Sequence, residues 1–149
     1  CGCGNHGCLE ALVSGPALTA EGIRLMLSGN APKLQALVEG DLRRVSPATM
    51  ATAAADGEAA IDDVLQRAAE WLGIAAANVV TTFHPELIVH GGGVSTLGER
   101  LARPVQEIIH RRVGMFSATD VRVKCSALGD EAGLYGGLAL ALKGGYKNL

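Results

Sequence analysis

The sequence opens with Cys1-Gly2-Cys3-Gly4-Asn5-His6-Gly7-Cys8-Leu9-Glu10, which places three of the four cysteines of the chain within eight residues. Disulfide bonds explain this cluster poorly, because three cysteines leave one unpaired and a Cys1–Cys3 bridge would close a strained, small ring. Thiolates separated by glycines suit a tetrahedral zinc ion, since glycine lets the backbone fold tightly enough for several sulfurs to meet at about 2.3 Å from one metal. We therefore expect Cys1, Cys3 and Cys8 to bind a structural zinc ion.

These residues leave the fourth zinc ligand open. His6 lies between Cys3 and Cys8, where closing a ring onto the same ion would be cramped but feasible. The alternative is a ligand outside this chain. The remaining cysteine, Cys125, stands far from the cluster in a stretch whose alternation turns it inward, so we expect it to behave as a small hydrophobe.

Composition predicts one globular domain in the 149 residues. Hydrophobic residues make up 48% and charged residues 19%, and with so few aromatic residues the core must be built from aliphatic side chains and alanine. A net charge of -2 gives no basic surface for nucleic acid or an anionic membrane. No apolar run approaches the roughly 20 residues of a membrane span, and no signal-peptide pattern is present. We expect a soluble, cytoplasmic protein, and a chain that is part of something longer.

The hydrophobic spacing predicts an α/β fold. Helices are expected over residues 9–14, 19–27, 48–55, 61–83, 97–112 and from about 130 to 143, with interruptions at Gly15-Pro16 and Pro104. The long helix is expected to bury a single face, made of Ile61, Leu65, Ala68, Leu72, Ala75, Val79 and Phe83. Asp130 is expected to cap the last helix.

Two strands are expected among these helices. Residues 86–89 are short, apolar and rich in β-branched side chains, which predicts a buried strand. Val121, Val123, Cys125 and Ala127 alternate with polar residues, which predicts a half-buried strand with these four side chains inward. The first strand runs into Gly91, Gly92 and Gly93 and then a helix. Bare glycine amides before a helix can bind a phosphate group, although three glycines on their own also suit a plain tight turn.

Three segments resemble the ROK family of sugar kinases and repressors. Residues 1–10 match its CxCGxxGCxE signature, residues 85–93 (Pro-Glu-Leu-Ile-Val-His-Gly-Gly-Gly) match its second hallmark, and residues 128–133 (Leu-Gly-Asp-Glu-Ala-Gly) resemble its C-terminal end. The resemblance extends over essentially the whole chain. It implies the actin-like ATPase fold, in which two ribonuclease-H-like lobes hold sugar and ATP between them. Residues 1–149 would form the C-terminal lobe, without the N-terminal lobe.

The resemblance assigns roles to residues of this chain. Cys1, Cys3 and Cys8 would be the thiolate ligands of the zinc ion, with an upstream histidine outside this chain as the fourth, which argues against His6. Glu10 would accept hydrogen bonds from sugar hydroxyls; the alternative is a solvated acid in the first turn of a helix. Residues 91–93 would lie against the nucleotide.

The activity that the resemblance implies is ATP-dependent phosphorylation of a hexose or N-acetylhexosamine by a glucokinase-like enzyme that uses Mg²⁺. The alternative is the sugar-sensing lobe of a transcriptional repressor, which carries a helix-turn-helix ahead of it. The family's catalytic aspartate and N-terminal phosphate loop are absent from this chain, so we expect no catalytic residue here and no activity from the chain alone. A homo-oligomer, dimer or tetramer, is expected.

The remaining acidic residues and histidines receive structural interpretations. Asp62 and Asp63 lie on the outer side of the predicted long helix and are expected to be solvated charges. His84, His90 and His110 do not cluster in sequence, so each is expected to be a structural or surface residue.

Overall fold

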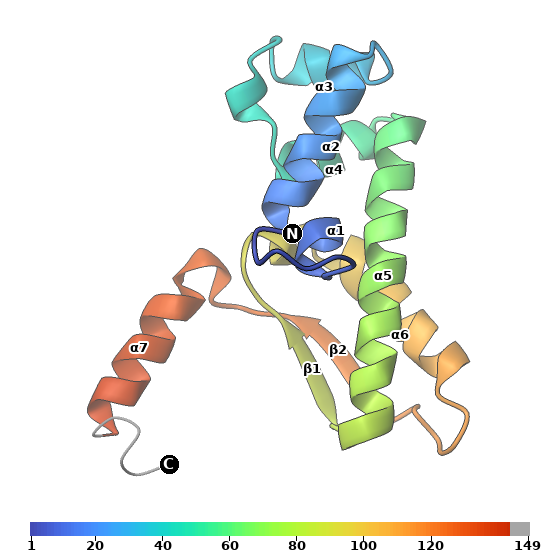
Figure 1. The fold of residues 1–149 in the computed structure, drawn as a ribbon, viewed down its shortest axis with the longest axis vertical. Helices are drawn as coiled ribbons and strands as arrows, with labels where there is room; N and C mark the ends of the chain where they lie inside the picture. Colours follow the sequence, from blue (N-terminus) through green and yellow to red (C-terminus); the bar gives the residue numbers. More distant parts are fainter. Residues whose placement is uncertain (144–149) are drawn as a thin grey trace.

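The computed structural model describes residues 1–143, except for the side chain of Asp130, and confirms the mixed helix and strand composition (Figure 1). The α-helices are α1 (Glu10–Val13), α2 (Gly15–Leu27), α3 (Pro32–Leu37), α4 (Pro47–Ala55), α5 (Ala59–Phe83), α6 (Glu99–Arg112) and α7 (Ala132–Leu142). The strands are β1 (Leu87–His90) and β2 (Arg122–Cys125), and short 3₁₀ turns are η1 (Leu42–Arg44), η2 (Gly93–Leu97) and η3 (Gly129–Glu131). The predicted cap by the Asp130 side chain lies outside the described residues.

Side-chain caps set the starts of two N-terminal helices. The Ser14 hydroxyl accepts a hydrogen bond from the Ala17 amide at 3.2 Å, and proline is tolerated in a first turn, so α2 begins at Gly15 and not near residue 19 as predicted. At α4, Ser46 and Thr49 form a capping box in which each side chain accepts a hydrogen bond from the other residue's amide. Both helices thus start where a local hydrogen bond satisfies their first amides.

The two strands are parallel and joined by α6. Ile88 pairs with Val123, and His90 pairs with Cys125. The side chain of Gln106 fastens α6 to the second strand, because its Nε2 donates to the Val121 carbonyl at 2.7 Å and its Oε1 accepts from the Val123 amide at 2.8 Å. A kink or restart is predicted at Pro104, and the restart is wrong, because α6 runs through Pro104 as one helix.

Helix α5 is the centre of the fold, but its buried face changes along its length. The first half of the predicted face is buried, whereas Val79 and Phe83 are 45% and 76% exposed. Ala76, Ala77 and Val80 are buried in their place. Different neighbours explain the change, since α2 and α4 lie beside the N-terminal half of α5 and α6 runs along its C-terminal half (Figure 1).

The sheet packs on one side only. Ile88 packs against the core, but Leu87 and Val89 are 42% and 54% exposed, so the prediction of a fully buried strand is wrong. In the described part of the chain, α6 packs against β2, and α7 stands away from both strands (Figure 1). Ala127 is also exposed, because β2 ends at Cys125.

Helix α7 stands away from the other elements (Figure 1). It is built of glycine, alanine, leucine and one tyrosine, yet none of its residues is buried, and it contacts mainly η3. Its exposed large side chains are Leu134, Tyr135, Leu138 and Leu142. In the described part of the chain no helix combines the length and apolarity of a membrane span.

Candidate functional site

The three N-terminal thiols converge as a metal site requires. The Sγ atoms of Cys1, Cys3 and Cys8 all lie within 4.8 Å of one another. The Cys3–Cys8 distance is 3.6 Å, close to the roughly 3.8 Å edge of a tetrahedron with zinc–sulfur bonds of about 2.3 Å. The chemistry and spacing of these donors therefore fit a zinc ion. His6 is not part of this group of ligand atoms.

Hydrogen bonds already favour a thiolate in this cluster. A hydrogen bond to the backbone of Asn5, followed by the contact with Cys8, lowers the pKa of Cys3. The same sulfur–sulfur contact raises the pKa of Cys8, and burial adds to this effect. The thiolate is the form that binds metal, so the lowered pKa of Cys3 favours metal binding.

Glu10 is fixed relative to this cluster by the start of a helix. It is the first residue of α1, and the Ala11 amide donates to the Cys8 carbonyl at 3.1 Å. The Glu10 side chain is exposed, and no hydrogen bond or ion pair to it is found in the described part of the chain. Its carboxylate is therefore available to a ligand.

The glycine loop follows directly on β1, at the carboxyl end of the parallel strands. Gly91, Gly92 and Gly93 are all exposed. Gly92 has φ 76° and ψ -172°, a conformation that side-chain-bearing residues rarely adopt. The Ser95 amide and hydroxyl both donate to the Gly92 carbonyl, at 2.9 and 2.7 Å, and hold the loop as it turns into η2.

One cavity of about 460 Å³ brings Glu10 and residues 91–93 together. Glu10 and the glycine loop are more than 80 positions apart in sequence, and the start of α1 lies near the carboxyl end of β1 (Figure 1). Much of the remaining wall is aliphatic and includes Leu9, Val13, Leu72, Val94 and Leu101. An apolar hollow with a few polar groups, at the carboxyl edge of parallel strands, is typical of a small-molecule site.

His90 lines the same cavity, although only a structural or surface role is predicted for it from its place in the sequence. Its Nε2 atom is buried and has no hydrogen-bond partner among residues 1–143, and burial lowers the pKa of the imidazole. A buried polar atom without a partner costs about 1–3 kcal/mol, so such atoms are rare in folded proteins. The available signal was its place directly before the glycines and two residues after the inward-facing Ile88.

The other histidines and Cys125 have structural surroundings. The His84 ring lies 4.0 Å from that of Phe116, and Nε2 of His110 is 2.7 Å from the Gln106 side-chain nitrogen. Cys125 is half-buried beside Gly98, and burial raises the pKa of its thiol.

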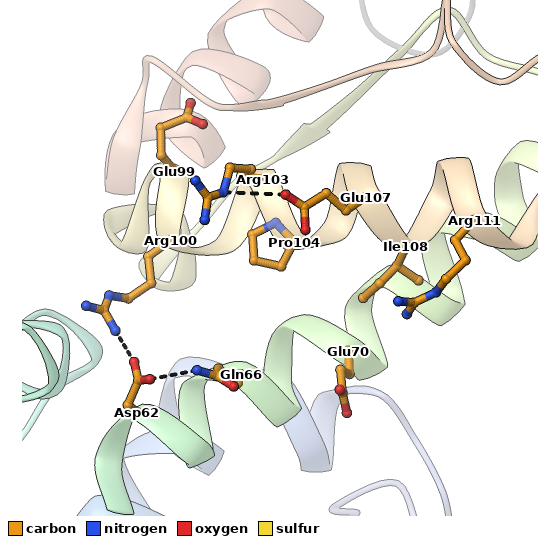
Figure 2. A pocket seen from close by; sticks show the side chains of 10 residues that line it. All are labelled: Asp62, Gln66, Glu70, Glu99, Arg100, Arg103, Pro104, Glu107, Ile108 and Arg111. Carbon is orange, nitrogen blue, oxygen red and sulfur yellow. Dashed lines mark hydrogen bonds and ion pairs between the residues drawn. The ribbon is translucent and has the colours of Figure 1, made fainter. Parts of the chain in front are cut away.

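A second, larger cavity of about 580 Å³ lies between α5 and α6 and contains none of the predicted site residues (Figure 2). In it Asp62 pairs with Arg100 and accepts a hydrogen bond from Gln66 at 2.6 Å. Asp62 is thus a partly exposed charge that is paired with Arg100, which the prediction of a solvated charge did not include, whereas Asp63 is exposed as predicted. Positive and negative side chains alternate along this groove, so it offers no concentrated charge to a ligand.

The family model that matches this chain is that of the ROK family, over residues 1–144. The xylose repressor of Caldicellulosiruptor bescii is 29% identical over 95% of this chain and 35% of the repressor. The glucokinase of Halalkalibacterium halodurans is 31% identical over 92% of this chain and 41% of the enzyme.

A solved structure is similar to this fold over almost its whole length. The ROK family glucokinase from Streptomyces griseus, in complex with glucose and AMPPNP, superposes with a TM-score of 0.79 and 31% identity over 94% of this chain. The matched part is 46% of that enzyme. The chain thus spans less than half the length of these relatives, and it has the fold of the corresponding part of an actin-like ATPase.

Proposed function

The chain belongs to the ROK family, and we propose that it contributes the C-terminal lobe of an ATP-dependent sugar kinase that phosphorylates a hexose or an N-acetylhexosamine. The supporting observation is the cavity that joins Glu10 to residues 91–93. In it the sugar lies against Glu10 and the nucleotide against the glycine loop. The glucose and AMPPNP in the Streptomyces griseus enzyme agree with this pair of ligands.

Glu10 binds and orients the sugar in this proposal. Its carboxylate only accepts hydrogen bonds, and sugar hydroxyls donate them. A carboxylate fixed at the first residue of α1 can hold two neighbouring hydroxyls and so aim a third one at the phosphate. Positioning of this kind is most of what a phosphoryl-transfer enzyme supplies.

The reaction moves one phosphoryl group. The sugar hydroxyl oxygen forms a bond to the γ-phosphorus of ATP while the bond to the bridging oxygen of ADP breaks. The hydroxyl proton passes to an aspartate outside this chain, and Mg²⁺ neutralises the charge on the phosphates. Because this base and the second phosphate loop are not among residues 1–149, we expect the chain alone to be inactive.

The zinc ion has a structural role in this proposal. Cys1, Cys3 and Cys8 hold it, and it supplies a fixed anchor two residues before Glu10, with no part in the transfer step. A cytoplasmic location and a homo-oligomer remain predictions.

A coupled assay on the full-length protein tests the kinase. Purified protein, MgATP and separate hexoses and N-acetylhexosamines are combined, and ADP release is followed. We expect sugar-dependent ADP release with at least one of them. Sugar binding without any turnover, together with specific DNA binding, would overturn the kinase assignment.

A sugar-sensing repressor is the second candidate, because the xylose repressor is about as similar to this chain as the glucokinase is. A repressor would use Glu10 and the same cavity to sense sugar. The sequence preceding Cys1 separates the two functions: a kinase has a phosphate loop and a catalytic aspartate there, and a repressor has a helix-turn-helix.

A further inference from the structure

Only three side chains in the wall of the Glu10–glycine-loop cavity carry polar groups: those of Glu10, Ser14 and His90. The Ser14 hydroxyl is engaged as the cap of α2, accepting from the Ala17 amide. Glu10 is exposed and has the role proposed above. His90 is therefore the remaining polar group of the wall, and its Nε2 has no partner within the described residues.

The backbone of His90 has its hydrogen-bond partners, so the unsatisfied hydrogen-bonding group is in the side chain. The His90 carbonyl accepts a hydrogen bond from the Ser126 amide at 2.7 Å, and His90 is opposite Cys125 in the parallel pairing of β1 and β2. Strand alternation places its side chain on the same face as Ile88, which packs into the core. An aliphatic residue would satisfy this position without any unpaired atom. The imidazole thus costs stability that the described fold does not recover.

We propose that the imidazole of His90 contacts the ligand of this cavity and hydrogen-bonds one of its hydroxyl groups. The inference rests on the proposed function, because it needs a sugar or a nucleotide in the cavity. A hydroxyl matches a neutral imidazole, since each group can both donate and accept. A phosphate matches it poorly, because burial lowers the pKa of His90 and so favours the uncharged ring, and Leu72 and Leu101 line the same space.

The ring has room to reach a ligand beside the glycine loop. A Cβ placed on Gly91, Gly92 or Gly93 would meet no atom within 4 Å, so the loop is not packed against the rest of the chain. The hydroxyl belongs either to the sugar or to the ribose of the nucleotide, and separate binding measurements distinguish these sources.

The test uses the full-length protein with His90→Leu, His90→Gln and, as a matched control, His110→Leu. His110 is exposed on α6 and does not line the cavity. Sugar affinity and nucleotide affinity are measured separately by calorimetry, together with Tm without ligand. Losing one hydrogen bond to a neutral group should weaken binding about threefold to tenfold.

We expect His90→Leu to weaken one of the two ligands while its Tm stays equal or rises. His90→Gln, whose amide also donates and accepts, should recover most of the affinity, and His110→Leu should leave both affinities unchanged, although its Tm can fall because His110 contacts Gln106. The weakened ligand identifies the source of the hydroxyl. Unchanged affinities in His90→Leu would overturn the inference, and so would a fall of Tm and affinity together, which indicates a structural partner elsewhere in the protein. A wild-type protein that binds neither ligand would instead overturn the proposed function itself.

Discussion

At the scale of single residues, the strongest consequence concerns Glu10. Charge-assisted hydrogen bonds to a carboxylate contribute about 1.5–3 kcal/mol each. Glu10→Ala in the full-length protein should therefore weaken sugar binding at least about tenfold and leave nucleotide binding nearly unchanged, as measured by calorimetry. Asp63→Ala is a suitable control, because this carboxylate is exposed on α5 and does not line the cavity. Equal sugar affinities for wild type and Glu10→Ala would show that the carboxylate is only a solvated acid.

The three glycines allow backbone strain to be separated from obstruction of the nucleotide. Only Gly92 has a positive φ, whereas a Cβ on Gly91 or Gly93 meets no protein atom and no backbone conflict. Gly91→Ala and Gly93→Ala should thus raise the KM for ATP severalfold at unchanged Tm. Gly92→Ala should in addition lower the free energy of unfolding by about 1 kcal/mol or more.

If all three variants keep the wild-type KM for ATP, the loop is a turn and not part of the nucleotide site. The comparison is informative because Gly92→Ala alone would mix the two causes. The conformation of the loop, which the sequence does not reveal, therefore decides which variants are diagnostic.

At the scale of elements, the close packing of α5 against α6 depends on the absence of a side chain at Gly73. A Cβ on Gly73 would lie 2.7–2.9 Å from three atoms of Ile108, including its Cβ at 2.8 Å. Gly73→Ala should therefore force the two helices apart and destabilise the protein by about 1–3 kcal/mol. Ile108→Val in the same background should restore only part of this loss, because the Cβ contact remains. Denaturant titration gives both values, and an unchanged midpoint for Gly73→Ala would contradict this packing.

We expect the N-terminal loop to depend on the proposed zinc ion, because residues 1–7 are exposed and their described hydrogen bonds are local. Elemental analysis of the full-length protein should find about one zinc per chain. Removal of the metal by a chelator should lower Tm and weaken sugar binding through the loosened start of α1, with nucleotide affinity nearly intact. Metal-free protein that keeps its native fold and full sugar affinity would rule out this anchoring role.

At the scale of the whole molecule, large apolar surfaces lack a neighbour within residues 1–143. They comprise the open face of the sheet at Leu87 and Val89, the end of α5 at Phe83, and the whole of α7. A helix that is apolar on all sides is ordinarily buried. We expect a chain of these 149 residues alone to bind the dye ANS strongly and to form aggregates of mixed size in gel filtration, whereas the full-length protein should bind the dye weakly and elute as one defined oligomer. Weak dye binding by the isolated chain would show that these surfaces find partners within it.

Local sequence patterns were enough to predict the family, the α/β class and most of the helices. The cysteine spacing predicted a metal cluster because Cys1, Cys3 and Cys8 are at most seven residues apart and need only a flexible loop to meet. The strand before the glycines and the helix after Gly98 could also be predicted, because proline, glycine and the alternation of apolar and polar residues are signals that act over a few residues. The caps at Ser14 and Ser46 shifted only the helix boundaries.

Contacts between distant segments were beyond those patterns. The exposed Val79 and Phe83, the half-open first strand and the Asp62–Arg100 pair each depend on which element lies beside them. The unpaired atom of His90 became visible only when its surroundings were known. The sequence by itself thus determined which groups the chain carries and in what local order. Only the tertiary structure decided that Glu10, His90 and the glycine loop share one cavity, because burial and proximity are set by packing between elements and not by the neighbours of a residue along the chain.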